Sequence, residues 1–165
     1  MAKLKKPSEF EFATIQMRGI IISHTIYIER KIDEFLSNHF CEKMERKNEL
    51  CELLLFTERI TFDMKKQMLY AIVKEHYKQF IKDNETFLQD MEAIAPHRNI
   101  FAHLEIDLSM CQPGTGNERI VFKKYKSGKF KPEVYTRDQI GTLSSQMRNV
   151  MESMDRLITA IPPLA

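Results

Sequence analysis

One short stretch of this sequence combines residue types that can act on a phosphate group. Arg98 and Asn99 are followed, after three residues, by His103. On a helix, Asn99 and His103 share one face, and the long side chain of Arg98 can partly reach toward them. Histidine can transfer a proton near neutral pH, and arginine presents a charged planar fork that matches phosphate oxygens. These side chains can cleave RNA without a metal: a 2′-hydroxyl attacks the adjacent phosphate while arginine stabilises the developing charge.

Each of these three residues also has a structural interpretation. Arg98 falls in register with apolar positions of its helix, so it can pair with an acid such as Glu92 or Glu105. His103 can cap the end of the helix, where a cation is favoured. Asn99 can make a local hydrogen bond to the backbone. The sequence leaves both sets of roles open.

Two further observations concern other arginine and histidine residues of the chain. Arg18 and His24 form a second, looser arginine–histidine pair, so the spacing alone is weak evidence. His97, directly before Arg98, is expected to face away from the motif and to be exposed.

The motif must be positioned by a mainly helical chain. Glycine and proline are few and clustered, so helix is expected between about residues 12 and 95. The first helix is expected over about 12–40, the second from near Glu45, and the third from Thr61, a typical N-cap. The fourth opens after Asn84 and carries the motif, and Pro96 should kink or restart it.

The pattern changes after the motif. Gln112–Asn117 has a loop composition, and 119–126 alternates as an edge strand would. Ser127 and Gly128 predict a turn, and residues 129–135 return as a second strand, which makes a small hairpin. The last helix is expected at about 137–160. Its apolar stripe can close the core or pair with a second copy, and the first is more common.

Two local signals refine this last region. Thr136 and Gln139 fit a capping box at the start of the last helix. The hairpin is the most basic segment of the chain. Its lysines can simply keep an exposed edge solvated, or they can hold an RNA backbone while an aromatic ring stacks on a base. The RNA-binding candidates are Lys123, Lys124, Tyr125, Lys126 and Lys129.

The composition limits the classes of protein to which this chain can belong. A chain of 165 residues with 43% hydrophobic and 29% charged residues is expected to be a single folded domain over 1–165. The net charge of +2 does not by itself indicate nucleic-acid binding. Three cysteines without a CxxC pair indicate free thiols. Because no signal peptide or long apolar run is visible, we expect a cytoplasmic protein that is not inserted in a membrane. We also expect no metal ion and no cofactor.

The Arg-Asn-x-x-x-His form of the motif, placed late in a helical chain, resembles the HEPN domain family. Arg98 matches the arginine of the family, Asn99 its polar position and His103 its histidine. The resemblance covers about residues 12–105 and, more loosely, the last helix. The hairpin at about 119–135 is an elaboration of the minimal four-helix version.

This resemblance implies an all-α, up-and-down helical bundle, here with a small β-hairpin inserted before the last helix. It implies a metal-independent endoribonuclease that works as a homodimer, with the motifs of two protomers facing one cleft. Such proteins often belong to toxin–antitoxin, phage-defence or RNA-processing systems, so the resemblance also implies an antitoxin or another protein as a partner. The alternative is a non-catalytic helical interaction or regulatory module that binds a protein through its last helix or hairpin.

Overall fold

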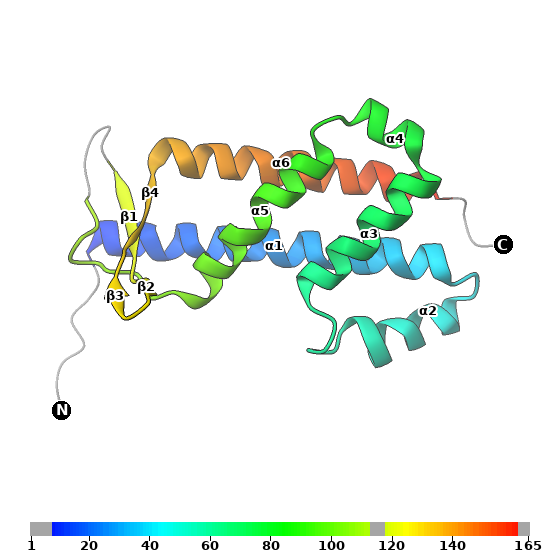
Figure 1. Cartoon of the computed structure of the whole chain (residues 1–165), viewed down its shortest axis with the longest axis horizontal. Coiled ribbons are helices and arrows are strands. Elements are labelled where there is room, and N and C mark those ends of the chain that lie inside the picture. The colour runs from blue at the N-terminus through cyan, green and yellow to red at the C-terminus, as the bar shows by residue number, and fades with distance from the viewer. Residues whose placement is uncertain (1–7, 113–117, 162–165) are drawn as a thin grey trace. The chain divides into compact units, whose positions relative to one another are not determined.

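The structure, a computed structural model, describes residues 8–112 and 118–161 and is mainly helical (Figure 1). A small antiparallel hairpin precedes the last helix, so the predicted all-α fold class with an inserted hairpin is confirmed. Among the described residues, no helix is both long and apolar enough to cross a membrane. The helices are α1 (Glu9–Phe40), α2 (Met44–Leu50), the π-helical η1 (Cys51–Leu55), α3 (Phe62–His76), α4 (Lys78–Asp83), α5 (Phe87–His103) and α6 (Arg137–Thr159).

The described residues divide into two compact units. The first contains the chain up to Ser23 together with Pro96–Ser145, and the second contains His24–Ala95 together with the chain from Gln146. The predicted loop at Gln112–Asn117 lies, from residue 113 onward, outside the described residues.

In the second unit, one sequence signal for a helix start is confirmed at Thr61 and another, at Asn84, is not. Thr61 caps α3, because its hydroxyl oxygen accepts a 3.3 Å hydrogen bond from the amide of Met64. The side chain of Asn84, the residue after which the fourth helix was expected to open, does not cap α5. Its amide instead donates to the carbonyl of Phe80 and its oxygen accepts from Arg156. The helix α5 then continues through Pro96 without restarting.

A buried ion cluster lies in the second unit. Lys65 is 3% exposed, and its Nζ lies 2.9 Å from a carboxylate oxygen of Glu29 and 2.9 Å from one of Asp33. Asp33 is itself buried, and the energetic cost of this burial raises its pKa, while Lys65 opposes that rise. Charges buried this deeply persist only when they are paired, so this cluster constrains how α1 and α3 pack within the unit.

The hairpin of the first unit follows the predicted strands. The strand β1 (Arg119–Phe122) pairs antiparallel with β4 (Glu133–Thr136), and β2 (Tyr125–Lys126) pairs with β3 (Lys129–Phe130). A hydrogen bond from the amide of Lys131 to the carbonyl of Lys124 joins the two ladders in one register. The connecting turn has φ values of 53° at Ser127 and 74° at Gly128, as a tight two-residue hairpin requires.

The strand β1 is not the edge strand that its sequence predicted. The segment after α5 pairs with its other side through bridges at Ile106–Phe122 and Gln112–Arg119. Ile120, Val121 and Phe122 are all buried, so the alternation of buried and exposed residues that the sequence predicted is absent. The edge-strand prediction was therefore wrong for β1.

The start of α6 is a capping box, as predicted. Thr136 donates its amide to the side chain of Gln139 at 2.9 Å, and Gln139 donates its amide back to the hydroxyl of Thr136 at 3.3 Å. The apolar stripe of α6 is buried, which supports the interpretation that it closes the core. The buried stripe comprises Ile140, Leu143, Met147, Val150, Met154 and Leu157.

Candidate functional site

The motif lies in the last two turns of α5, within the first unit. Asn99 and His103 are exposed and four residues apart, so they share one face of the helix. Arg98 is half-buried, and its Nη1 donates a 3.3 Å hydrogen bond to the Oδ1 of Asn99. The helix therefore brings all three motif residues to one exposed end of α5.

His103 is the final residue of α5. Its ring makes no hydrogen bond or ion pair with any of the residues that the structure describes. An imidazole that is accessible and uncommitted can exchange protons with a bound substrate. The capping role that the sequence left open for His103 is filled by a different side chain.

Arg18 provides that cap. Its Nε donates a 2.7 Å hydrogen bond to the carbonyl of Phe101, and its Nη2 donates a 3.1 Å bond to the carbonyl of Ala102. These carbonyls lack partners within the helix, and the negative end of the helix dipole favours a cation there. Sequence reasoning missed this role, because nothing near Arg18 in the chain indicates a helix terminus 83 residues away.

The two acids offered as structural partners of Arg98 both bind lysines. Glu105 lies 2.6 Å from the Nζ of Lys123, and Glu92 lies 2.8 Å from the Nζ of Lys66. The first pair ties the hairpin to the segment that follows the motif, within the same unit.

An aromatic cluster fixes the end of α5 against the hairpin. The ring centroid of Phe101 lies 4.9 Å from that of Phe122 in β1 and 4.9 Å from that of Tyr135 in β4. Both contacts are edge-to-face, and all three residues are buried. The hairpin thus positions the helix turn that carries the motif.

His97 belongs to the same cluster. Its Nδ1 forms a 2.7 Å hydrogen bond with the hydroxyl of Tyr135. Burial lowers the pKa of His97 and raises the pKa of Tyr135, because both charged forms lose contact with water. The expectation that His97 would be exposed was wrong, since the hairpin covers its ring.

The predicted RNA-binding residues separate into two groups. Lys123 and Lys124 are half-buried and form ion pairs, the second with Glu133 at 2.8 Å. Tyr125, Lys126 and Lys129 are exposed at the tip of the hairpin. The two tip lysines form no ion pair with other described residues.

The described residues contain no group of three or more histidine, cysteine, aspartate or glutamate side chains that could hold a metal ion. The three cysteines are free thiols. Burial raises the pKa of Cys111, whose sulfur accepts a 3.3 Å hydrogen bond from the amide of Val121.

The first unit also holds an apolar cavity of about 410 Å³. The motif residues do not line it. Its walls are formed by Phe10, Ala13, Thr14, Met17, Glu118, Arg119, Ile120, Arg137 and Ile140.

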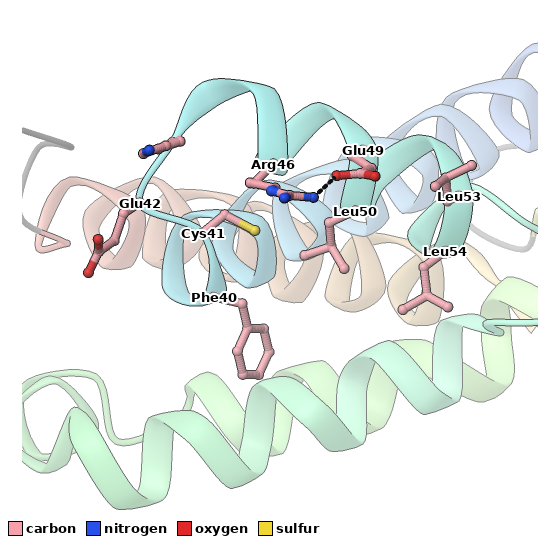
Figure 2. A pocket seen from close by; sticks show the side chains of 9 residues that line it. Phe40, Cys41, Glu42, Arg46, Glu49, Leu50, Leu53 and Leu54 are labelled. Atoms are coloured by element: carbon pink, nitrogen blue, oxygen red, sulfur yellow. Dashed lines mark hydrogen bonds and ion pairs between the residues drawn. The ribbon is translucent and has the colours of Figure 1, made fainter.

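The second unit carries an open groove of about 760 Å³ (Figure 2). Its apolar part consists of Phe40, Leu50, Leu53 and Leu54, of which Leu53 is 70% exposed. Charges of both signs surround it, including the 2.7 Å ion pair between Arg46 and Glu49.

Family models, curated proteins and solved structures were compared with this chain, and none of them matches it.

Proposed function

We propose that this protein is an endoribonuclease that cleaves RNA with Arg98, Asn99 and His103, by the metal-independent chemistry of the HEPN domains that its motif resembles. The observation that carries the proposal is the exposed, uncommitted ring of His103 on the same helix end as the Arg98–Asn99 pair. A proton-transfer group and a cation thereby lie on the same end of one helix.

His103 and Arg98 have distinct roles in this reaction. The 2′-oxygen attacks phosphorus as its proton leaves, and the bond from phosphorus to the 5′-oxygen breaks as that oxygen gains a proton. His103 takes part in this proton transfer as base or acid. Arg98 binds the phosphate oxygens and stabilises the charge that develops on them. The products are a 2′,3′-cyclic phosphate and a free 5′-hydroxyl.

Asn99 is the orienting residue in this proposal. Its side-chain oxygen accepts a hydrogen bond from Arg98, which restricts the directions that the guanidinium can take. The guanidinium of Arg98 is suited to phosphate oxygens in shape and charge, because its planar fork presents parallel N–H groups.

We further propose that the protein acts as a homodimer. Three large apolar side chains on α1 are more than half exposed within the first unit: Phe12 (54%), Ile15 (52%) and Ile20 (54%). A second copy that covered them would remove this apolar surface from water. Sedimentation velocity of wild type and of Ile15→Glu tests this, since the substitution should shift a dimer to monomer.

The central experiment is cleavage of mixed RNA in EDTA by wild type and by His103→Ala. Wild type should cleave and leave 2′,3′-cyclic phosphate ends, whereas His103→Ala should lose cleavage and keep its helical circular dichroism. His24→Ala is the matched control, because it removes a histidine outside the motif. Equal cleavage by wild type and His103→Ala would refute the mechanism.

A second function is favoured by the groove on α2 and η1. A partly apolar groove bordered by mixed charges is typical of a surface that binds another protein. In that case no RNA is cleaved, and Leu53→Lys should abolish retention of one specific partner while His103→Ala does not. The last helix is a poor docking element for this function, because its apolar stripe is buried.

A further inference from the structure

We infer that the tip of the hairpin binds unpaired nucleotides, with Tyr125 and Phe130 stacking on bases and Lys126 and Lys129 contacting phosphates. This inference deepens the proposed function by naming single-stranded RNA as the substrate class, and it rests on that proposal for its biological meaning. The binding itself can be tested independently of cleavage.

The first observation is an exposed aromatic pair. Tyr125 and Phe130 lie directly opposite each other on β2 and β3, and their ring centroids are 5.6 Å apart. Tyr125 is 68% exposed and Phe130 is 45% exposed. A cross-strand aromatic pair stabilises a hairpin, but such large exposure also leaves much ring surface in water. Aromatic surface of this kind stacks on bases without requiring a particular sequence.

The second observation is the arrangement of charge around this pair. Lys126 and Lys129 are also directly opposite each other, and they lie next to the aromatic pair along the two strands. Successive residues of a strand point to opposite faces, so the ribbon has one aromatic face and one lysine face. A ribbon of two strands is narrow, so lysine side chains on one face can extend past the edge of the ribbon toward the other face. A nucleotide strand crossing the tip can thus place bases on the rings and phosphates beside the ammonium groups.

The third observation is that the described part of the chain offers the tip lysines no ion-pair partner. Lys123 and Lys124, nearer the base of the hairpin, are committed to Glu105 and Glu133. Lys126 and Lys129 form no ion pair with another described residue. Protection of a sheet edge does not explain them fully either, because a two-residue strand exposes little edge.

The chemistry favours unpaired over paired nucleic acid. A base that is stacked and paired inside a duplex does not offer its face to a protein ring, whereas a base in a loop or single strand does. The cleavage chemistry proposed above also needs a flexible backbone, because the 2′-oxygen must line up with the bond that breaks. Single-stranded RNA and single-stranded DNA both present aromatic base faces and phosphates, so we expect the tip by itself to bind both.

The test is fluorescence anisotropy with a labelled single-stranded RNA, an RNA duplex and a single-stranded DNA of equal length. All proteins carry His103→Ala, so that the RNA stays intact. The parent should bind both single strands more tightly than the duplex. The added pair Tyr125→Leu and Phe130→Leu should weaken single-strand binding by about tenfold or more. The added pair Lys126→Gln and Lys129→Gln should reduce the slope of log K against log salt by about 1.4.

A matched control removes two exposed lysines elsewhere. Lys78→Gln with Lys82→Gln makes the same change in net charge on α4 and should leave binding and its salt slope unchanged. Circular dichroism of each variant checks that the helices are intact. The inference fails if the tip variants bind like the parent, if the duplex binds as well as the single strands, or if the parent binds no nucleic acid.

This experiment is separable from the test of the proposed function. Histidine-dependent cleavage with unchanged binding by the tip variants would refute the tip site alone. Tip-dependent binding with no cleavage by the protein that retains His103 would refute the nuclease and leave the tip site standing. If the tip residues instead contact a protein partner, the variants will bind all three nucleic acids like the parent.

Discussion

The Nε of Arg18 donates a 2.7 Å hydrogen bond to the carbonyl of Phe101, two residues before His103 at the end of α5. A residue near the start of the chain thus fixes the helix terminus that carries the proposed catalytic histidine. Because Arg18 donates hydrogen bonds to the carbonyls at this helix end, His103 does not have to cap its own helix.

Replacing Arg18 should destabilise the fold. Arg18→Ala removes two charge-assisted hydrogen bonds to partly buried carbonyls, so the free energy of unfolding should fall by about 1.5–3 kcal/mol. Urea denaturation followed by circular dichroism measures this. Arg148→Ala, at an exposed position of α6, is the control and should change stability by less than about 0.5 kcal/mol. Equal stability of the two variants would contradict the capping role.

The hydrogen bond between His97 and Tyr135 should make stability depend on pH. Burial lowers the pKa of His97 in the folded state below the ordinary value of 6.5, so the unfolded chain binds the proton more readily. The contribution of neutral His97 to the stability of the fold is therefore fully present above pH 6.5, and it is lost as the pH falls toward the pKa of His97 in the folded state. His97→Gln should show a smaller loss of melting temperature than wild type between about pH 7.5 and pH 5.5. If the plots of melting temperature against pH were parallel for the two proteins, His97 would not contribute to the pH dependence of stability.

The buried ion cluster should be sensitive to the loss of its cation. Lys65→Met leaves the carboxylate of Asp33 buried without its partner, and this should cost about 3–5 kcal/mol of unfolding free energy. Adding Asp33→Asn removes the orphaned charge and should recover part of the loss. Chemical denaturation of both single variants and the double variant gives the coupling energy. Additive effects would mean that the two side chains do not interact.

The capping box at the start of α6 predicts a smaller effect. Thr136→Ala removes the hydroxyl that accepts the amide of Gln139, at a cost of about 1 kcal/mol. Thr136→Ser keeps the hydroxyl and should retain most of the stability. Thermal denaturation distinguishes the two, and the cap would be irrelevant if serine and alanine behaved alike.

Arg98→Lys tests whether the fork of the guanidinium matters for cleavage. Lysine keeps the charge but loses the planar set of donors, so RNA cleavage should fall by roughly a hundredfold with little change in stability. Arg148→Lys is the control and should retain full activity. The proposed contact with the phosphate would be excluded if Arg98→Lys cleaved RNA at the wild-type rate.

Local signals accounted for much of this fold. The N-cap at Thr61, the capping box at Thr136 and the turn at Ser127 and Gly128 each depend on residues within a few positions of one another. Such features are encoded in short stretches, so the sequence is enough to place them. The motif on α5 was likewise visible as a helical spacing.

The errors arose where distant segments meet. The segment after α5 pairs with β1 through bridges at Ile106–Phe122 and Gln112–Arg119, so a strand predicted to be an edge has neighbours on both sides. The ring of His97 is covered by Tyr135, which lies 38 residues later in the chain. No local pattern indicates either contact, because burial depends on which elements the whole chain brings together.

The sequence by itself determined the helical class, the hairpin before the last helix and the residue types of the motif, because periodicity and turn chemistry act over short distances. Only the tertiary structure decided which side chains are available for chemistry. It committed Arg18 to a helix end and paired Lys123 and Lys124 with acids, while His103 and the tip of the hairpin stayed exposed. The physical reason is that exposure and pairing are set by neighbours remote in sequence, whose positions are fixed by packing of the core.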